Sequence, residues 1–269
     1  MKVATQTTKQ DVYNAVPFTW ENPYAVISNK DIMDKIESNL HQLGLQIVSE
    51  NYRSSRTQSG LIKGVIGEWN LRNEDGDFGT RLAFRNSYDK SMSFCFCIGN
   101  CIWVCENGCY SGDYGLKRVH KGDAFEDAMI SINNGFEIID NKYKLIKEQL
   151  NCLKDVKVDK ELSYKLIGDL FFEQEAISIT QLSIIKRELI NSKNFRHIND
   201  DGFTAYDLYN NITESLKTSP VNSMIEDHVA LHTLFENEFN LPKHITTQQV
   251  EEPVEIIKPT LEEVVEFAE

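Results

Sequence analysis

The sequence lacks any long hydrophobic run. No stretch of its 269 residues approaches the roughly 20 consecutive apolar residues that a transmembrane helix needs. The first residues are polar and lack the apolar segment of a secretory signal. We therefore expect no membrane association and predict a cytoplasmic protein.

The chain also lacks the cysteine pattern of a disulfide scaffold or of a zinc site. Five of its six cysteines lie in one apolar stretch, at Cys95, Cys97, Cys101, Cys105 and Cys109. Zinc sites usually present pairs of cysteines two residues apart, whereas the last four of these recur at every fourth position. We predict reduced, buried thiols, and neither a metal nor another cofactor.

Signature motifs of common enzymes are missing as well. The sequence has no zinc-protease helix motif, no nucleophile elbow, no dinucleotide fingerprint and no Walker A motif. Asp89, His120 and Asp123 have side chains suited to metal binding or acid–base chemistry, but nothing in their spacing brings them together. We predict a non-enzymatic protein and keep a metal-dependent hydrolase as an alternative.

An overall excess of basic charge, the usual sign of a nucleic-acid-binding protein, is absent, because the net charge is −13. The acidic charge is unevenly distributed. Residues 1–120 carry 13 basic and 13 acidic side chains, whereas residues 246–269 carry seven glutamates and a single lysine. Local nucleic-acid binding in the neutral half therefore stays open.

The hydrophobic pattern predicts an α+β fold. Ser28 begins a helix with an apolar stripe, and segments rich in β-branched and aromatic residues then predict an antiparallel meander of about five strands. Gly99 and Asn100 have the composition of a two-residue hairpin turn, as do Asn107 and Gly108. The predicted strands cover residues 45–52, 61–71, 81–85, 92–98 and 101–105.

From Asp123 onward the apolar period becomes helical. Apolar residues alternately four and three positions apart predict one continuous helix from Asp123, its cap, to Leu150, and Gly135 inside it should weaken it by about 1 kcal/mol relative to alanine. Four further helices form a C-terminal bundle. The predicted units are an N-terminal arm (1–27), an α+β core domain (28–152), a helical region (153–242) and an acidic, flexible tail (243–269).

The middle of the chain resembles a known family. The matching positions are Asn86, Ser87, Asp89, Ser91, Cys105, Asn107, Gly108, His120 and Gly122. Over about residues 24–217 this pattern resembles the phage/plasmid-like proteins classed as domain of unknown function 932, with Lys90 in place of the family's glycine. That family has no established activity, so the resemblance implies a phage or mobile-element origin and a host bacterial cytoplasm. The order of helix, antiparallel strands and long helix is also similar to the core of Rad52-type single-strand annealing proteins.

The glycine-rich segment 108–122 is the strongest candidate site. Gly108, Gly112 and Gly115 permit close approach of the backbone to a ligand. Basic side chains then gather before a predicted helix N-terminus, where unpaired amides favour anions. Two tyrosines suit stacking on bases. The predicted nucleic-acid-binding residues are Tyr110, Tyr114, Lys117, Arg118, His120 and Lys121.

The family motif supplies a second polar cluster, made of Asn86, Ser87, Asp89, Ser91 and Asn107. Asn, Asp and Ser favour loops held by side-chain-to-backbone hydrogen bonds, so a structural role is the first interpretation. The other interpretation is a polar cluster that faces the glycine-rich segment.

Together these features predict a phage protein of nucleic-acid metabolism that binds single-stranded DNA or RNA in recombination or replication. The acidic tail would then recruit a protein partner. A homo-oligomer of the chain stays open as well. The alternative outside this class is a protein–protein interaction module that inhibits a host defence or replication factor.

Overall fold

The structure is a computed structural model that describes residues 5–18, 26–72, 78–102, 107–110, 116–118 and 123–243. Residues 107–109 and 116–118 are described by their backbone. The predicted acidic tail, apart from its first residue, and much of the glycine-rich segment lie outside these residues.

Within the described residues, seven strands form one antiparallel sheet, which confirms the predicted α+β class. The strands are β1 (Thr5–Gln6), β2 (Ile47–Arg56), β3 (Ile62–Leu71), β4 (Phe78–Ser87), β5 (Phe94–Ile102), β6 (Asn107–Tyr110) and β7 (Leu116–Arg118). Strands β2 to β6 form an antiparallel meander of five strands, the predicted number. The predicted strands 92–98 and 101–105 are not separate, however, because Cys101 and Ile102 continue β5, and β6 was not predicted; the short β1 and β7 are further additions. Both β6 and β7 pair with the same edge of β5, one near each of its ends.

Strand β5 corrects one predicted turn. Gly99 and Asn100 lie inside this strand, where they pair with Arg81 and Thr80 of β4 and do not form a hairpin. Asn100 is fully buried, and its amide donates to the carbonyl of Tyr143 at 3.4 Å. Pairing on both edges of β5 thus overrides the local turn chemistry. Asn107 and Gly108 belong to β6, so they form no hairpin turn either.

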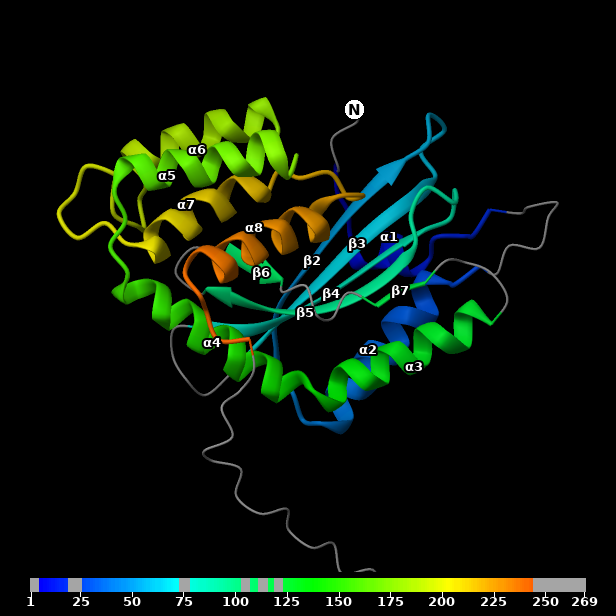
Figure 1. Cartoon of the computed structure of the whole chain (residues 1–269). Helices are drawn as coiled ribbons and strands as arrows, with labels where there is room; N and C mark the ends of the chain where they lie inside the picture. The colour runs from blue at the N-terminus through cyan, green and yellow to red at the C-terminus, as the bar shows by residue number, and fades with distance from the viewer. Residues whose placement is uncertain are drawn as a thin grey trace, which may run out of the picture.

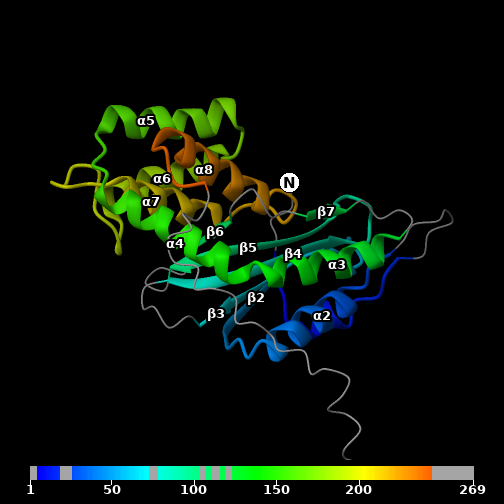
Figure 2. The ribbon, with the colours of Figure 1, turned by 60° about the horizontal axis from the view of Figure 1, so that its bottom comes forward.

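Two helices cover one face of the sheet (Figure 2). They are α2 (Asn29–Gln42) and α3 (Ala124–Glu137), and their apolar side chains share one core with those of the strands. The predicted cap of α2 is confirmed, because the Ser28 hydroxyl accepts from the amide of Asp31 at 3.4 Å. The predicted N-terminal arm contains two short regular elements. Strand β1 pairs with β2, and the short helix α1 (Lys9–Tyr13) buries Val12.

The predicted long helix is divided. α3 ends at Glu137, and α4 (Ile139–Asp155) begins after Ile138, whose φ of −112° and ψ of 4° are not helical. The apolar residues of α3, together with Ile139 directly after the break, join the core beneath the sheet, whereas those from Tyr143 onward join the helical bundle, so the break lies close to the change from one core to the other. Asp123 is the N-cap residue of α3, as predicted, but its side chain makes no capping hydrogen bond.

The remaining helices form the predicted bundle (Figure 1). They are α5 (Lys160–Gly168), a π-helical turn (Asp169–Glu173), α6 (Ile179–Asn191), α7 (Ala205–Leu216) and α8 (Met224–Glu238). The N-terminal part of α8 packs on the second face of the sheet, where Met224 and Ile225 contact Ile66 and Ala83. Its later residues enter the bundle core. The predicted boundary at residue 153 falls inside α4.

Candidate functional site

Four of the five polar residues of the family motif lie at a turn between β4 and β5, whereas Asn107 is on β6 opposite Ile102, at the other end of β5. Asn86 is fully buried at the end of β4, and its amide donates to the Ile27 carbonyl at 2.7 Å and to Asn29 Oδ1 at 2.8 Å. The Ser87 hydroxyl donates to the Met92 carbonyl at 2.9 Å and accepts from the Met92 amide at 3.0 Å. These contacts fix the start of α2 and close the turn, in keeping with the structural interpretation.

The tip of the turn is charged. Asp89 Oδ1 accepts from the backbone amide of Ser91 at 3.1 Å, and Asp89 Oδ2 lies 3.3 Å from Lys63 Nζ on β3. Lys90 between them has a φ of +63°, which is the left-handed conformation that glycine adopts most readily. The backbone at position 90 therefore has the conformation that the family's usual glycine favours.

The sheet register brings this turn and the predicted basic residues to one end of the molecule. Strand β4 ends at Ser87 and β5 begins at Phe94, which pairs with Arg118 of β7. Lys117 is thus opposite Cys95, one residue further along. The backbone of β7 lies next to β5 at the end of the sheet where the β4–β5 turn projects (Figure 1).

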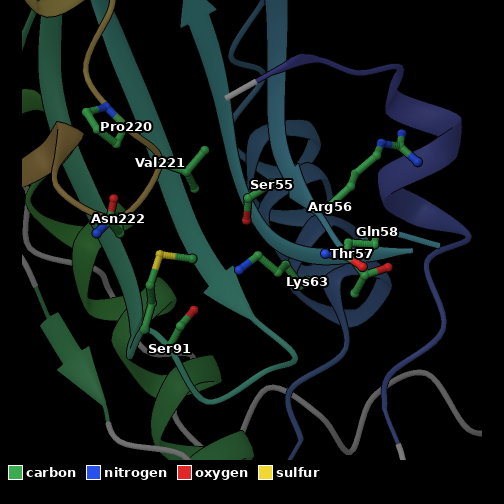
Figure 3. A pocket seen from close by; sticks show the side chains of 10 residues that line it. Ser55, Arg56, Thr57, Gln58, Lys63, Ser91, Pro220, Val221 and Asn222 are labelled. Atoms are coloured by element: carbon green, nitrogen blue, oxygen red, sulfur yellow. The ribbon is translucent and has the colours of Figure 1, made fainter. Parts of the chain in front are cut away.

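A cavity of about 550 Å³ opens at the same end. We call it the Lys63 cavity; its lining residues are Ser55, Arg56, Thr57, Gln58, Lys63, Ser91, Met92, Pro220, Val221 and Asn222. Figure 3 shows Lys63 and Ser91 pointing into the space between the β2–β3 hairpin and the segment before α8. Arg56 points away toward α1, where its guanidinium lies 3.3 Å from Asp11. The cavity therefore combines one inward-facing ammonium group with hydroxyls and an apolar side.

Tyr110 is not where the sequence analysis placed it. Its side chain is fully buried beneath α8, and its ring packs edge-on against His228 with 5.3 Å between the centroids. The Tyr110 hydroxyl donates to Glu68 Oε1 at 2.5 Å. A ring enclosed in this way is not available to stack on a base, so Tyr110 is removed from the predicted binding residues.

Glu68 lies at the centre of a polar network on this second face of the sheet. Its Oε2 accepts from Asn51 at 2.8 Å, and its Oε1 lies 3.6 Å from Arg81. Burial alone would raise the pKa of Glu68, but the charges of Arg81 and Arg53 and the bonds from Tyr110 and Asn51 hold it below its ordinary value. Glu68 is therefore a carboxylate at neutral pH, although its side chain is only 4% exposed.

A second cavity, of about 400 Å³, lies over this network. We call it the Arg53 cavity; its lining residues are Gln6, Ser49, Glu50, Asn51, Arg53, Glu68, Asn70, Arg81, Lys217, Met224 and His228. The guanidinium of Arg53 donates to the Lys217 carbonyl at 2.8 Å and contacts Met224 Sδ. These bonds tie the middle of β2 to the segment that connects α7 with α8.

Other predicted residues are placed in part. Tyr114, His120 and Lys121 lie outside the described residues, and Lys117, Arg118 and Asn107 are placed by their backbone. Cys95, Cys97 and Cys101 are buried thiols, as predicted. Among the described residues, no three His, Cys, Asp or Glu side chains gather closely enough to hold a metal ion, and no helix is long and apolar enough to cross a membrane.

The sequence analysis missed the Glu68 network. Glu68, Arg81 and Arg85 each interrupt an apolar strand, and such charges inside predicted strands were the available signal. Their pairing depends on the register, which places Glu68 of β3 opposite Ala83 and two residue pairs from Arg81 of β4, so that both side chains lie on the same face of the sheet.

These features define a class of α+β protein, an antiparallel sheet with helices on both faces and two polar cavities beside β2. The sequence profile of the family described as Domain of unknown function (DUF932) matches residues 19–226, which is most of the chain. The chain therefore belongs to this family. No curated protein and no solved structure matches it.

Proposed function

We propose that this protein binds single-stranded nucleic acid at the end of the sheet formed by the Lys63 cavity and β7, as a phage or plasmid protein of recombination or replication. The proposal depends on one observation. The register of β5 places the basic residues Lys117 and Arg118 on the strand beside the β4–β5 turn, and the Lys63 cavity opens at that turn.

The chemistry of this end of the sheet suits a phosphate backbone. Lys63 supplies an ammonium group, and Ser55, Thr57 and Ser91 supply hydroxyls that can donate to phosphate oxygens. Asp89 lies 3.3 Å from Lys63, so the ammonium group would exchange this partner or share it on binding. The apolar side formed by Met92, Pro220 and Val221 can contact an unstacked base.

The order of elements gives further support. Helix α2, the antiparallel strands β2 to β5 and then helix α3 follow the order noted for the core of Rad52-type single-strand annealing proteins. This likeness is one of topology and carries no residue roles. It favours single strands over duplexes as the ligand.

Binding of a labelled single-stranded oligonucleotide, measured by fluorescence anisotropy at several salt concentrations, tests the proposal. We expect the affinity to fall with salt, because each neutralised phosphate releases counterions. The double variant Lys117→Gln/Arg118→Gln should reduce the slope of log K against log salt by about 1.4, which is the loss of two single-strand phosphate contacts. Lys63→Gln should weaken binding at low salt.

Lys186→Gln/Arg187→Gln is the matched control, because it removes the same two charges from exposed positions on α6, away from β7 (Figure 1). Its binding curve should equal that of the unaltered protein. A weak affinity that does not change with salt, or an equal loss in the control and in the Lys117→Gln/Arg118→Gln variant, contradicts the proposal.

A further inference from the structure

The Arg53 cavity has no part in the proposed function, yet it is built from charged groups that folding alone does not require. Glu68 and Arg81 have side chains that are 4% and 8% exposed. Replacing a buried ion pair by apolar residues of similar volume is often neutral or stabilising, so such a pair is weak evidence for a role in stability. A pair that lines a cavity of about 400 Å³ points to a ligand.

Both carboxylates of the cavity are already satisfied by donors of the protein. Glu68 accepts from Tyr110 at 2.5 Å and from Asn51 at 2.8 Å. Glu50 accepts from Lys9 at 3.0 Å and from Tyr52 at 3.1 Å. The acidic groups therefore offer few acceptor positions to a bound molecule.

The groups that remain toward the cavity are mainly donors. Ser49 Oγ accepts from Asn70 Nδ2 at 2.9 Å, which leaves the serine hydroxyl proton to donate. Asn70 Oδ1 accepts from Arg81 Nε at 2.7 Å, and the second amide proton of Asn70 is left. Arg53 lines the cavity, and its two Nη atoms each keep one proton beyond the bonds to the Lys217 carbonyl and to Met224 Sδ. A bound group with several acceptor oxygens would accept hydrogen bonds from these remaining donors.

The charge of the lining also favours an anion. Lys217 is paired with Glu214 at 2.7 Å and Glu50 with Lys9 at 3.0 Å. The remaining charges of the lining are two cations, Arg53 and Arg81, against one carboxylate, Glu68. The low-dielectric sheet floor strengthens the attraction of a fixed excess charge for an oxyanion. Arginine and hydroxyl donors on several elements match a phosphate better than a carboxylate, which offers two oxygens.

We propose that the Arg53 cavity binds the phosphate group of a small molecule, with Arg53, Ser49 and Asn70 as its donors. The site is separate from the end of the sheet proposed to bind single strands, because its lining shares no residue with the Lys63 cavity. Both inorganic phosphate and a nucleoside monophosphate carry this chemistry, and the measurement distinguishes them.

Isothermal titration calorimetry of the full chain with inorganic phosphate, and separately with adenosine 5′-monophosphate, tests the site in a chloride buffer of matched ionic strength. We expect saturable binding with one site per chain. Tighter binding of the monophosphate would identify a nucleotide as the source, and equal binding would identify free phosphate.

Ser49→Glu places a carboxylate at the exposed rim of the cavity and should weaken phosphate binding about tenfold by repulsion. Val48→Glu adds the same charge at the neighbouring exposed residue, which does not line the cavity, and should bind phosphate as the unaltered protein does. Arg53→Gln should abolish binding. The absence of phosphate binding above the chloride baseline overturns the proposal, as does equal binding by Ser49→Glu and Val48→Glu.

Discussion

At the scale of the residue, Lys90 has a left-handed backbone conformation, which residues with a side chain rarely adopt. A residue with a Cβ atom is destabilised by about 1–2 kcal/mol in this conformation, whereas glycine adopts it freely. The turn around Lys90 is held by Ser87, which bonds to the backbone of Met92, and by Asp89, which accepts from the amide of Ser91. The φ of +63° is the conformation favoured by the glycine that the family usually has at this position.

We expect Lys90→Gly to raise the free energy of unfolding by about 0.5–1 kcal/mol, since relief of strain exceeds the entropy that glycine gains in the unfolded chain. Urea unfolding followed by circular dichroism measures this change. Lys90→Ala removes the same side chain but keeps the Cβ atom, so it should not stabilise. If the alanine variant is stabilised as much as the glycine variant, the backbone is not the cause.

At the scale of the element, α3 shows that helix propensity alone can predict the wrong sign for the effect of a substitution on stability. Gly135 lies inside this helix, and helix propensity alone predicts that alanine would stabilise it by about 1 kcal/mol. In the folded protein, however, a Cβ atom at Gly135 would lie 2.6 Å from Cε1 of Phe96 on β5. That ring is itself held by stacking on Phe136. The close approach of helix and sheet therefore requires glycine.

We expect Gly135→Ala to lower the free energy of unfolding by about 1–2 kcal/mol, because overpacking the core outweighs the gain in helix propensity. Gly168→Ala in α5 is the matched control. No heavy atom lies within 4 Å of a Cβ atom built there, so the variant should gain about 0.5–1 kcal/mol. Thermal unfolding of both variants decides the matter, and a stabilised Gly135→Ala would show that Phe96 moves aside easily.

A local sequence pattern does not contain contacts with distant residues, and this explains which elements were predicted and which were not. Strands β2 and β3 and helices α5 to α8 have a clear period and flanking turn residues, and these are local signals. The continuity of β5 through Gly99 and the break after Glu137 depend on partners distant in sequence. The Glu68 network is likewise set by strand register, which no local pattern contains.

At the scale of the whole molecule, α8 joins the sheet to the helical bundle. Near its start, Glu226 accepts from the buried Arg85 of β4 at 2.8 Å, and Arg85 also donates to the Asn222 carbonyl at 2.8 Å. Further along, His232 Nε2 bonds to Gln149 Oε1 of α4 at 2.9 Å. A change in the stability of α8 should therefore affect the unfolding of the whole protein and not one layer.

Asp227 in the first turn of α8 makes that stability depend on pH. Burial, with a smaller contribution from Glu226, raises the pKa of Asp227 from 3.8 to about 6, although hydrogen bonds from Ser219 and Ser223 oppose the shift. Between about pH 4 and 6 the folded protein thus holds a proton that the unfolded chain releases. This residue's contribution to the free energy of unfolding therefore rises as the pH falls from 7 to 4.

Asp227→Asn should remove that dependence and stabilise the protein at pH 7 by about 1–3 kcal/mol, since the neutral amide keeps an oxygen that can accept from Ser223, which donates to Asp227 Oδ2 at 3.1 Å. Urea unfolding at pH 5 and pH 7 measures the effect, which should be larger at pH 7. Asp201→Asn, at an exposed turn position, makes the same chemical change and should leave both values almost unaltered. A destabilised Asp227→Asn at pH 7 would mean that the carboxylate is favourably held beneath α8, and that the link between this helix and the sheet depends on its charge.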